Sequence, residues 1–258
     1  MTGPAGVTAL VLAETVAGGL VLLFLTPLWG EVKRGFFTLT GAVLLVLAAA
    51  AWGSVAAGVT PGEPAGAWSL RLSAALSGTI LVWVGLVLAR RHTAARALGV
   101  ASAGLSLAVL VAMAGTSQGS SVVALLQLLA GAAFLGAVVD GLLLGHWYLT
   151  DRALTRAPIN RYTDLLLAGV VLEAGALILG GFGPTEAGPD FNPLLTSAGL
   201  ASWIALGMVG TTATIAVLIR LTLRGTRSSA VQAATGFFYL AVITALTAEF
   251  AAKVRFLP

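Results

Sequence analysis

Long apolar runs joined by short polar connections dominate this chain and restrict the folds open to it. A transmembrane helix needs about 20 consecutive apolar residues to cross the hydrocarbon core of a bilayer. With 58% hydrophobic and 9% charged residues, the chain also departs far from the roughly 25% charged residues of soluble domains. We therefore expect an all-α polytopic transmembrane helix bundle of about eight spans, a single integral membrane domain over residues 1–258. The runs lie near residues 5–29, 35–58, 68–89, 97–115, 121–146, 162–182, 195–219 and 229–252.

The cations predict how these helices are oriented. Short loops rich in Lys and Arg stay in the cytoplasm, whereas the connections between the basic clusters carry Glu63, Glu186 and Asp190. We therefore expect a multi-pass protein of a bacterial-type cytoplasmic (inner) membrane, with both termini outside and the lipid bilayer as its first partner. Eleven of the fourteen cations fall in four clusters: Lys33 and Arg34; Arg90, Arg91 and Arg96; Arg152, Arg156 and Arg161; Arg220, Arg224 and Arg227.

Composition and missing motifs exclude several functional classes. The net charge of +4 does not indicate nucleic-acid binding, because the basic residues lie at helix ends rather than along a stripe. The absence of cysteine excludes disulfides, thiolate metal sites and thioether attachment of haem. The sequence holds no phosphate-binding Gly-rich loop, no zinc-protease HExxH and no GxSxG nucleophile elbow. We therefore expect no metal site, no covalently bound cofactor and no enzyme activity of the chain by itself.

Carboxylates inside the predicted spans are the main site candidates. An ionised side chain at mid-bilayer costs at least about 2.5–3.5 kcal/mol, so such residues usually face the bundle interior or a wet cavity. Glu14 and Glu173 are predicted at similar depth, roughly 13 Å below the outer surface at about 1.5 Å of rise per residue. They could share a cavity, open to the outside, that takes up protons, a cation, or the headgroup of a quinone or lipid. Alternatively, each is hydrogen-bonded for structural reasons across a helix interface.

The two other intramembrane acids have more local explanations. Asp140 lies near the cytoplasmic end of its helix, where a structural pair with an inner-loop arginine is expected and a proton-entry or substrate-binding role is the alternative. Glu249 precedes Lys253 by four residues, the favourable order for a helical ion pair. We expect a surface pair near the outer interface.

The cytoplasmic face carries a second group of candidates. In Gly145-His146-Trp147-Tyr148, the two aromatic residues are typical interfacial anchors, while His146 could be a proton relay, a quinone donor or a haem ligand. Haem is not expected, because His146 and His92, the two histidines of the chain, both lie beside arginines in loops rather than inside a four-helix core. The segment 146–161 could form a short interfacial helix. A phosphorylated ligand or acidic partner could bind at Arg91, His92 and Arg161, although topology alone explains these residues.

The two halves of the sequence resemble each other weakly. An offset of 118 residues aligns Trp29 with Trp147 and Gly18 with Gly136, and an offset of 133 aligns Arg91 with Arg224. Chance similarity between apolar segments is the alternative to a tandem repeat. Parallel repeats of residues 1–118 and 119–258 would form two four-helix bundles related by an axis along the membrane normal.

This paired arrangement resembles, at the level of architecture, membrane subunits of the NrfD type, which hold quinones without cofactors of their own, and the halves of haem A synthase. Haem A synthase needs histidines that this chain lacks, and no motif of NrfD-type subunits can be assigned to a residue here. The resemblance implies a class of architecture and ligand only.

Our leading hypothesis is therefore a non-catalytic integral subunit of a larger membrane complex, of an energy-converting kind, with other membrane subunits as partners and a quinone or lipid near Glu14 and Glu173. The alternative is a small secondary transporter that uses these acids to couple proton or cation movement. A membrane enzyme acting on lipids through its Arg/His face ranks third.

Overall fold

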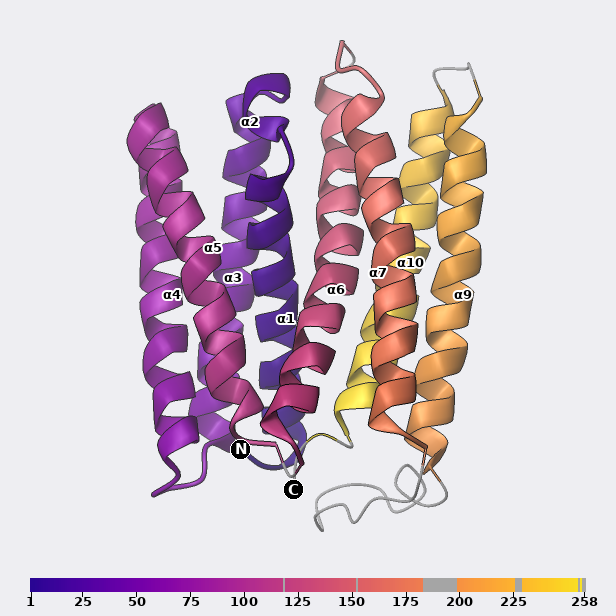
Figure 1. Ribbon diagram of the computed structural model, residues 1–258. Helices are drawn as coiled ribbons and strands as arrows, with labels where there is room; N and C mark the ends of the chain where they lie inside the picture. Colours follow the sequence, from indigo (N-terminus) through magenta and orange to yellow (C-terminus); the bar gives the residue numbers. More distant parts are fainter. Residues whose placement is uncertain (118, 152, 183–198, 226–228, 255, 257–258) are drawn as a thin grey trace.

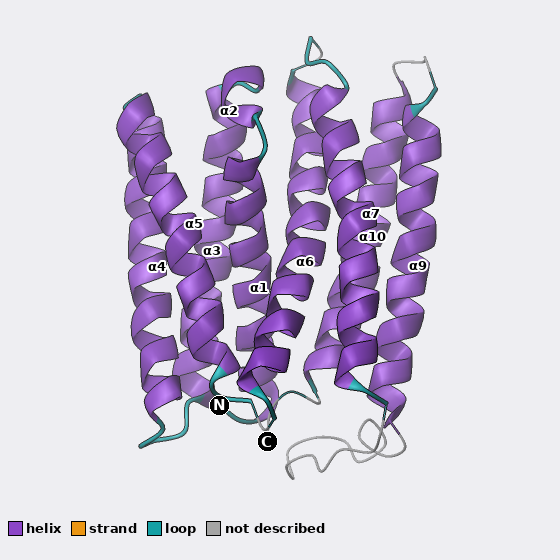
Figure 2. Ribbon diagram, in the orientation of Figure 1, coloured by secondary structure: helices purple, strands orange, loops and turns teal. Residues whose placement is uncertain are grey.

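The computed structural model describes residues 1–117, 119–151, 153–182, 199–225, 229–254 and 256. The expected outer loop with Glu186 and Asp190, and the cations Arg152 and Arg227, lie outside the described residues. Within the described part, every regular element is a helix, and eight helices are long and apolar enough to cross a membrane. Figure 2 shows this all-helical composition. The polytopic bundle of about eight spans is thus confirmed.

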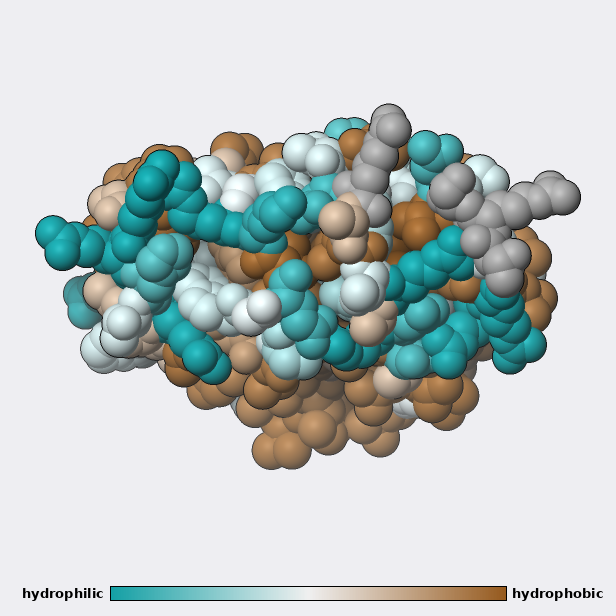
Figure 3. Space-filling view, turned by 90° about the horizontal axis from the view of Figure 1, so that it is seen from above, coloured by the Kyte–Doolittle hydropathy of each residue, from teal (hydrophilic) through white to brown (hydrophobic). Residues whose placement is uncertain are grey.

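The helices run antiparallel to their neighbours along the chain (Figure 1). Both termini lie at one end of the bundle, here called the terminal face. The connections that carry the basic clusters lie at the opposite end, here called the basic face, where Figure 3 shows many hydrophilic side chains. The helices are α1 (Gly3–Leu25), α2 (Leu28–Glu31), α3 (Arg34–Gly58), α4 (Pro64–Leu88), α5 (His92–Ala114), α6 (Ser121–Thr150), α7 (Ala157–Gly180), α9 (Leu200–Leu223) and α10 (Ser229–Lys253).

The helix boundaries follow from proline and from helix length. Pro27 has no backbone N–H and clashes with the preceding turn, so α1 stops at Leu25 and the short α2 follows. α6 continues to Thr150, and α7 begins at Ala157 with a proline in its first turn. The expected interfacial helix over 146–161 is wrong. Its first residues extend α6, its last residues begin α7, and the described residues between are not helical.

Each half of the chain closes a ring of four helices. In the first half α1 contacts α3, α3 contacts α4, α4 contacts α5, and α5 returns to α1; in the second half α6, α7, α9 and α10 repeat this order. α1 and α6 form the main contact between the two rings. Figure 1 shows the two groups side by side.

Two contacts across this seam join positions that the 118-residue offset aligns. A Cβ atom on Gly136 would overlap the backbone of Gly18, and Lys33 Nζ lies 3.0 Å from Asp151 Oδ1. In addition, Arg34 donates to the last carbonyls of α4, and Arg156 to those that end α9. A two-fold axis between α1 and α6 would produce such contacts, but the repeat itself stays a prediction.

Candidate functional site

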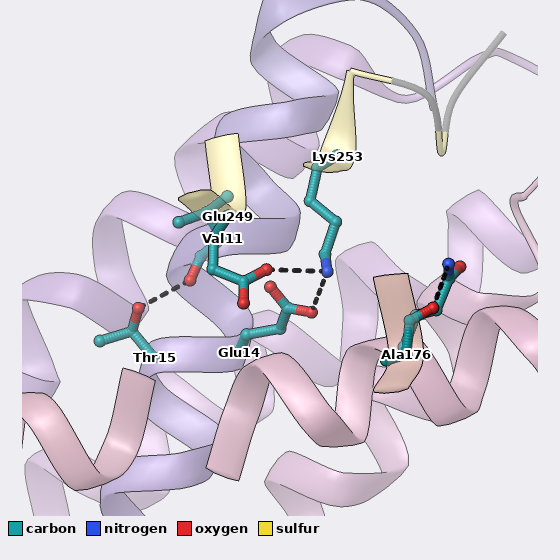
Figure 4. A network of polar contacts seen from close by, with 7 residues as sticks. Val11, Glu14, Thr15, Ala176, Glu249 and Lys253 are labelled. Atoms are coloured by element: carbon teal, nitrogen blue, oxygen red, sulfur yellow. Dashed lines mark hydrogen bonds and ion pairs between the residues drawn. The ribbon is translucent and has the colours of Figure 1, made fainter. Parts of the chain in front are cut away.

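Four charged side chains meet inside the bundle near its terminal face. Lys253 Nζ lies 2.8 Å from Glu14 Oε1 and 2.9 Å from Glu249 Oε2, and all three side chains are at most 2% exposed. Figure 4 shows the lysine amine between the two carboxylates. Glu173 is also buried and interacts with Glu249 and Lys253. We call Glu14, Glu173, Glu249 and Lys253 the acid cluster.

The acid cluster joins three helices that are distant in sequence. Glu14 lies in the middle of α1, Glu173 two turns before the end of α7, and Glu249 and Lys253 in the last turns of α10. The structure therefore brings together Glu14 and Glu173, which the sequence placed at similar depth. The expected ion pair between Glu249 and Lys253 is present, but its expected location on the surface is wrong. α10 turns this pair inward against α1 and α6.

A glycine on α6 makes room for the cluster. A Cβ atom on Gly131 would lie 2.6 Å from Glu14 Oε1 and 3.0 Å from Glu249 Oε2. Real Cβ atoms do not approach oxygen so closely, so any larger residue would displace one of the two carboxylates. Gly131 therefore leaves space for these two carboxylates where α6 packs against α1 and α10.

The cluster contains more acids than bases. When all four groups are ionised, three carboxylates face one ammonium group. Glu14 Oε2, Glu173 Oε2 and Glu249 Oε1 are buried and accept no hydrogen bond from any described residue. Buried polar atoms without partners are unfavourable, so these oxygens need protons, water or a cation. The described residues contain no group of three or more His, Cys, Asp or Glu arranged to hold a metal ion.

A cavity of about 300 Å³ adjoins the cluster at the terminal face. It lies between the ends of α6, α7, α9 and α10, and its lining includes Ser120, Gln127, Glu173 and Lys253. Gln127 donates to the Ala176 carbonyl, which holds its side chain at the cavity wall. Glu173 and Lys253 are therefore the members of the cluster that a molecule in this cavity would meet first. Glu14 and Glu249 do not line the cavity.

Asp140 is buried in the half of the bundle nearer the basic face. The expected pair with an arginine is wrong: no cation lies in ion-pair range of Asp140 among the described residues. Instead, Tyr162 donates a hydrogen bond of 3.0 Å to Asp140 Oδ2. Two arginines of the basic face pair with other acids, Arg161 with Glu31 at 2.7 Å and Arg220 with Asp164 at 3.2 Å. These arginines are thus taken up by acids of the basic face, and Asp140 is left with Tyr162.

The remaining candidates lie apart on the basic face. His146 is exposed in the last turns of α6, and its Nδ1 lies 3.4 Å from the Tyr239 hydroxyl. Arg91 and His92 are exposed at the start of α5. Within the described residues, no hydrogen bond joins the two histidines or connects Arg91 with Arg161. The structure therefore does not assemble them into one site.

Comparison of the chain with protein-family models, with curated proteins and with solved structures gave no match. These comparisons therefore add no family to the architectural resemblance with NrfD-type subunits.

Sequence analysis missed three residues of these sites. Lys253 was predicted to form a surface pair with Glu249, and neither Gly131 nor Tyr162 was predicted to belong to a site. The sequence signal for the buried lysine was its spacing, because Lys253 follows the intramembrane acid Glu249 by one helical turn. This spacing predicts an ion pair but does not show whether the pair faces the bundle interior or the surface.

Proposed function

We propose that the protein is a small secondary transporter that takes up protons at the acid cluster. The observation that carries this proposal is the surplus of buried carboxylates over buried bases beside a cavity at the terminal face. Ionisable groups inside a membrane protein are costly and commonly mark proton or ion pathways. In the sequence, Glu14 and Glu173 supported a transporter only as the alternative hypothesis. Because these acids and Glu249 lie together around one lysine, the transporter is now favoured over a non-catalytic subunit.

Protons fit the cluster better than metal cations do. The Lys253 amine already lies between two carboxylates, in the position that a bound cation would take. A proton needs a single acceptor oxygen, and three buried oxygens in the cluster accept no hydrogen bond from the described residues. Uptake of two protons would leave one carboxylate paired with one ammonium group. Such a neutral pair is far less costly in a low-dielectric interior than a net charge is.

The arrangement also supports a link between proton uptake and helix packing. Lys253 ties α10 to α1 through its ion pair with Glu14. A proton from the cavity would first reach Glu173, which lines it, and could then pass to Glu249, whose charge acts on Glu173. Protonation of Glu249 or Glu14 removes a negative charge from the Lys253 amine and so weakens one of its two ion pairs. A state in which α10 has moved relative to α1 would then be populated more.

Proton uptake into liposomes tests the proposal. Purified protein is reconstituted, a membrane potential is imposed, and the internal pH is followed with a trapped dye. We expect uptake by the wild type, and a strong loss with Glu173→Gln and with Glu14→Gln. Glu63→Gln is the control, because this partly exposed carboxylate pairs with the N-terminal amine outside the cluster. Wild-type uptake equal to that of empty liposomes, or unchanged uptake in both cluster variants, would contradict the proposal.

A second candidate is the complex subunit that binds a quinone or lipid. An apolar groove of about 400 Å³ runs between α6 and α7. Leu179 lines both this groove and the cavity beside the acid cluster. An amphipathic molecule could therefore place its chain along Leu126 and Leu172 and its polar head near Glu173. Native purification with mass spectrometry separates the two candidates: stable partner subunits or a retained quinone favour the subunit, and an isolated chain favours the transporter.

A further inference from the structure

Asp140 is a buried acid that the proposed uptake site does not use. Its side chain is 0% exposed, and Oδ1 accepts no hydrogen bond from the described residues. Among the described residues, the hydrogen bond to Oδ2 comes from Tyr162. A buried acid with one oxygen left without a partner is costly, and such residues inside a membrane protein commonly mark proton pathways.

A short series of hydroxyl groups leads from Asp140 toward the basic face. The Tyr162 hydroxyl lies 3.0 Å from Asp140 Oδ2 and 3.5 Å from Thr26 Oγ1. Thr26 follows the end of α1 and lines a pocket of about 240 Å³ together with Trp29 and Arg96. The pocket is formed by the break at Pro27, at the end of the bundle opposite the termini. Water in this pocket would be two hydroxyl groups away from the buried acid.

We propose that Asp140, Tyr162 and Thr26 form a second proton-exchange site, which takes protons from the basic face of the protein. This proposal rests on the proposed function, because it supplies the exit or entry on the opposite side from the acid cluster. A protein that moves protons across the membrane needs ionisable groups accessible from each side.

A proton can pass along Thr26 and Tyr162 to Asp140 without a net change in either hydroxyl group. The Thr26 hydroxyl donates to the Leu22 carbonyl at 2.8 Å, so it first turns toward the Tyr162 oxygen. A hydronium ion in the pocket then gives a proton to Thr26 Oγ1, which passes its own proton to the Tyr162 oxygen. Tyr162 in turn gives its hydroxyl proton to Asp140 Oδ2. Water is left in the pocket, both hydroxyl groups are regenerated, and the carboxylate becomes a neutral carboxylic acid. The reverse sequence releases the proton, so no oxidant or other reactant is required.

The surroundings of Asp140 contain little that could compete for the proton. On α7 it faces Tyr162, and on α1 it faces Gly19, whose Cβ atom would lie 3.5 Å from Oδ1. Among the described residues, no cation lies within ion-pair distance of Asp140, and Tyr162 is its side-chain hydrogen-bond partner. The second oxygen is therefore left for a proton or a water molecule.

Both exchange sites border the same seam between α1 and α6. Glu14 and Gly19, which face the acid cluster and Asp140 respectively, are five residues apart on α1, or about 7.5 Å of helix rise. Gly131 and Asp140 are nine residues apart on α6, or about 13 Å. Between the two sites the helices touch at Gly18, where there is no side chain to carry a proton. Transfer between the sites would thus need water or helix movement at this seam.

Infrared difference spectroscopy can observe Asp140 separately from the acid cluster. A neutral carboxylic acid has a C=O stretching band that shifts when its proton is replaced by deuterium. We expect Asp140→Asn to remove one such band from the reconstituted protein and to abolish proton uptake. Tyr162→Phe should retain the Asp140 band but slow its shift after transfer to D2O. Tyr239→Phe, an exposed tyrosine on α10, is the matched control and should leave both unchanged.

A thiol-specific block tests the side from which Asp140 is reached. The chain has no cysteine, and a side chain added at Gly30 in the pocket wall would meet no other atom within 4 Å. A membrane-impermeant maleimide attached to Gly30→Cys should slow deuterium exchange at Asp140 and leave the bands of Glu14 and Glu173 unchanged. The unmodified Gly30→Cys protein is the control.

The two proposals fail in different ways. Absence of an Asp140-dependent band at any pH, or unchanged exchange in both Tyr162→Phe and blocked Gly30→Cys, would overturn the second site and leave the acid cluster intact. Proton uptake that survives Glu173→Gln and Glu14→Gln but is lost in Asp140→Asn would overturn the proposed function and keep the second site.

Discussion

At the residue scale, one lysine determines the character of the acid cluster. Lys253 is 2% exposed and makes both of its ion pairs inside the bundle. Such a pair contributes little over an apolar pair, but breaking it leaves uncompensated buried charge. The cost of changing Lys253 should therefore depend on the acids that remain.

We predict that Lys253→Met lowers the free energy of unfolding by about 3–5 kcal/mol, because it leaves buried carboxylates without a cation. Adding Glu14→Gln and Glu249→Gln to the same chain should recover much of the loss. Denaturant or thermal unfolding in detergent is the measurement. Lys33→Met is the matched control: Lys33 is 72% exposed in its pair with Asp151, and exposed pairs contribute at most about 1 kcal/mol. Equal effects of the two substitutions would refute the prediction.

Gly131 allows a second prediction at this scale. Gly131→Ala inserts a methyl group against Glu14 and Glu249, so we expect a loss of about 1–3 kcal/mol in stability from overpacking, together with reduced proton uptake. Gly210→Ala on α9 is the control, because a Cβ atom there would meet no atom within 4 Å. Uptake in the Gly131 variant at the wild-type level would show that the carboxylates can shift without consequence.

At the element scale, close packing of small residues, rather than polar interactions between side chains, determines where each helix lies. The spanning helices are largely apolar, and lipid supplies no hydrophobic force between them, so close approach of small residues holds them together. The seam between α1 and α6 depends on such an approach: a Cβ atom on Gly18 would overlap the backbone carbonyl of Ala132. A backbone atom cannot move aside as a flexible side chain can.

We therefore predict that Gly18→Ala forces α1 and α6 apart and destabilises the fold by at least about 1–3 kcal/mol. Gly104→Ala on α5 should have little effect, because the added methyl group would meet no atom within 4 Å. The melting temperature in detergent compares the two variants. Similar melting temperatures would show that the seam is not a rigid contact.

At the scale of the whole molecule, charge and connectivity separate the two faces. The termini share one face, and the connections with the basic clusters share the other. Each half of the chain closes a four-helix ring, but a tandem repeat of the two halves stays a prediction. Superposition of the two rings by rotation about the membrane normal is the test of the repeat.

The positive-inside rule predicts that the basic face is cytoplasmic. A reporter that is active only in the cytoplasm should be inactive when fused after Pro258 and active when fused after Arg90, in the connection between α4 and α5. An active fusion after Pro258 would mean that the orientation is reversed, and the acid cluster would then take protons from the cytoplasm.

The sequence by itself determined the number of spans, their antiparallel order and the common face of both termini, because run length and cation placement act locally along the chain. It also selected Glu14, Glu173 and Asp140 as buried, because a carboxylate in lipid is costly whatever the fold. Only the tertiary structure decided which side chains meet. Lys253 and Glu249 turn inward and Asp140 binds Tyr162 instead of an arginine, because helices that are apolar on every side carry no signal for the face that contacts a neighbour.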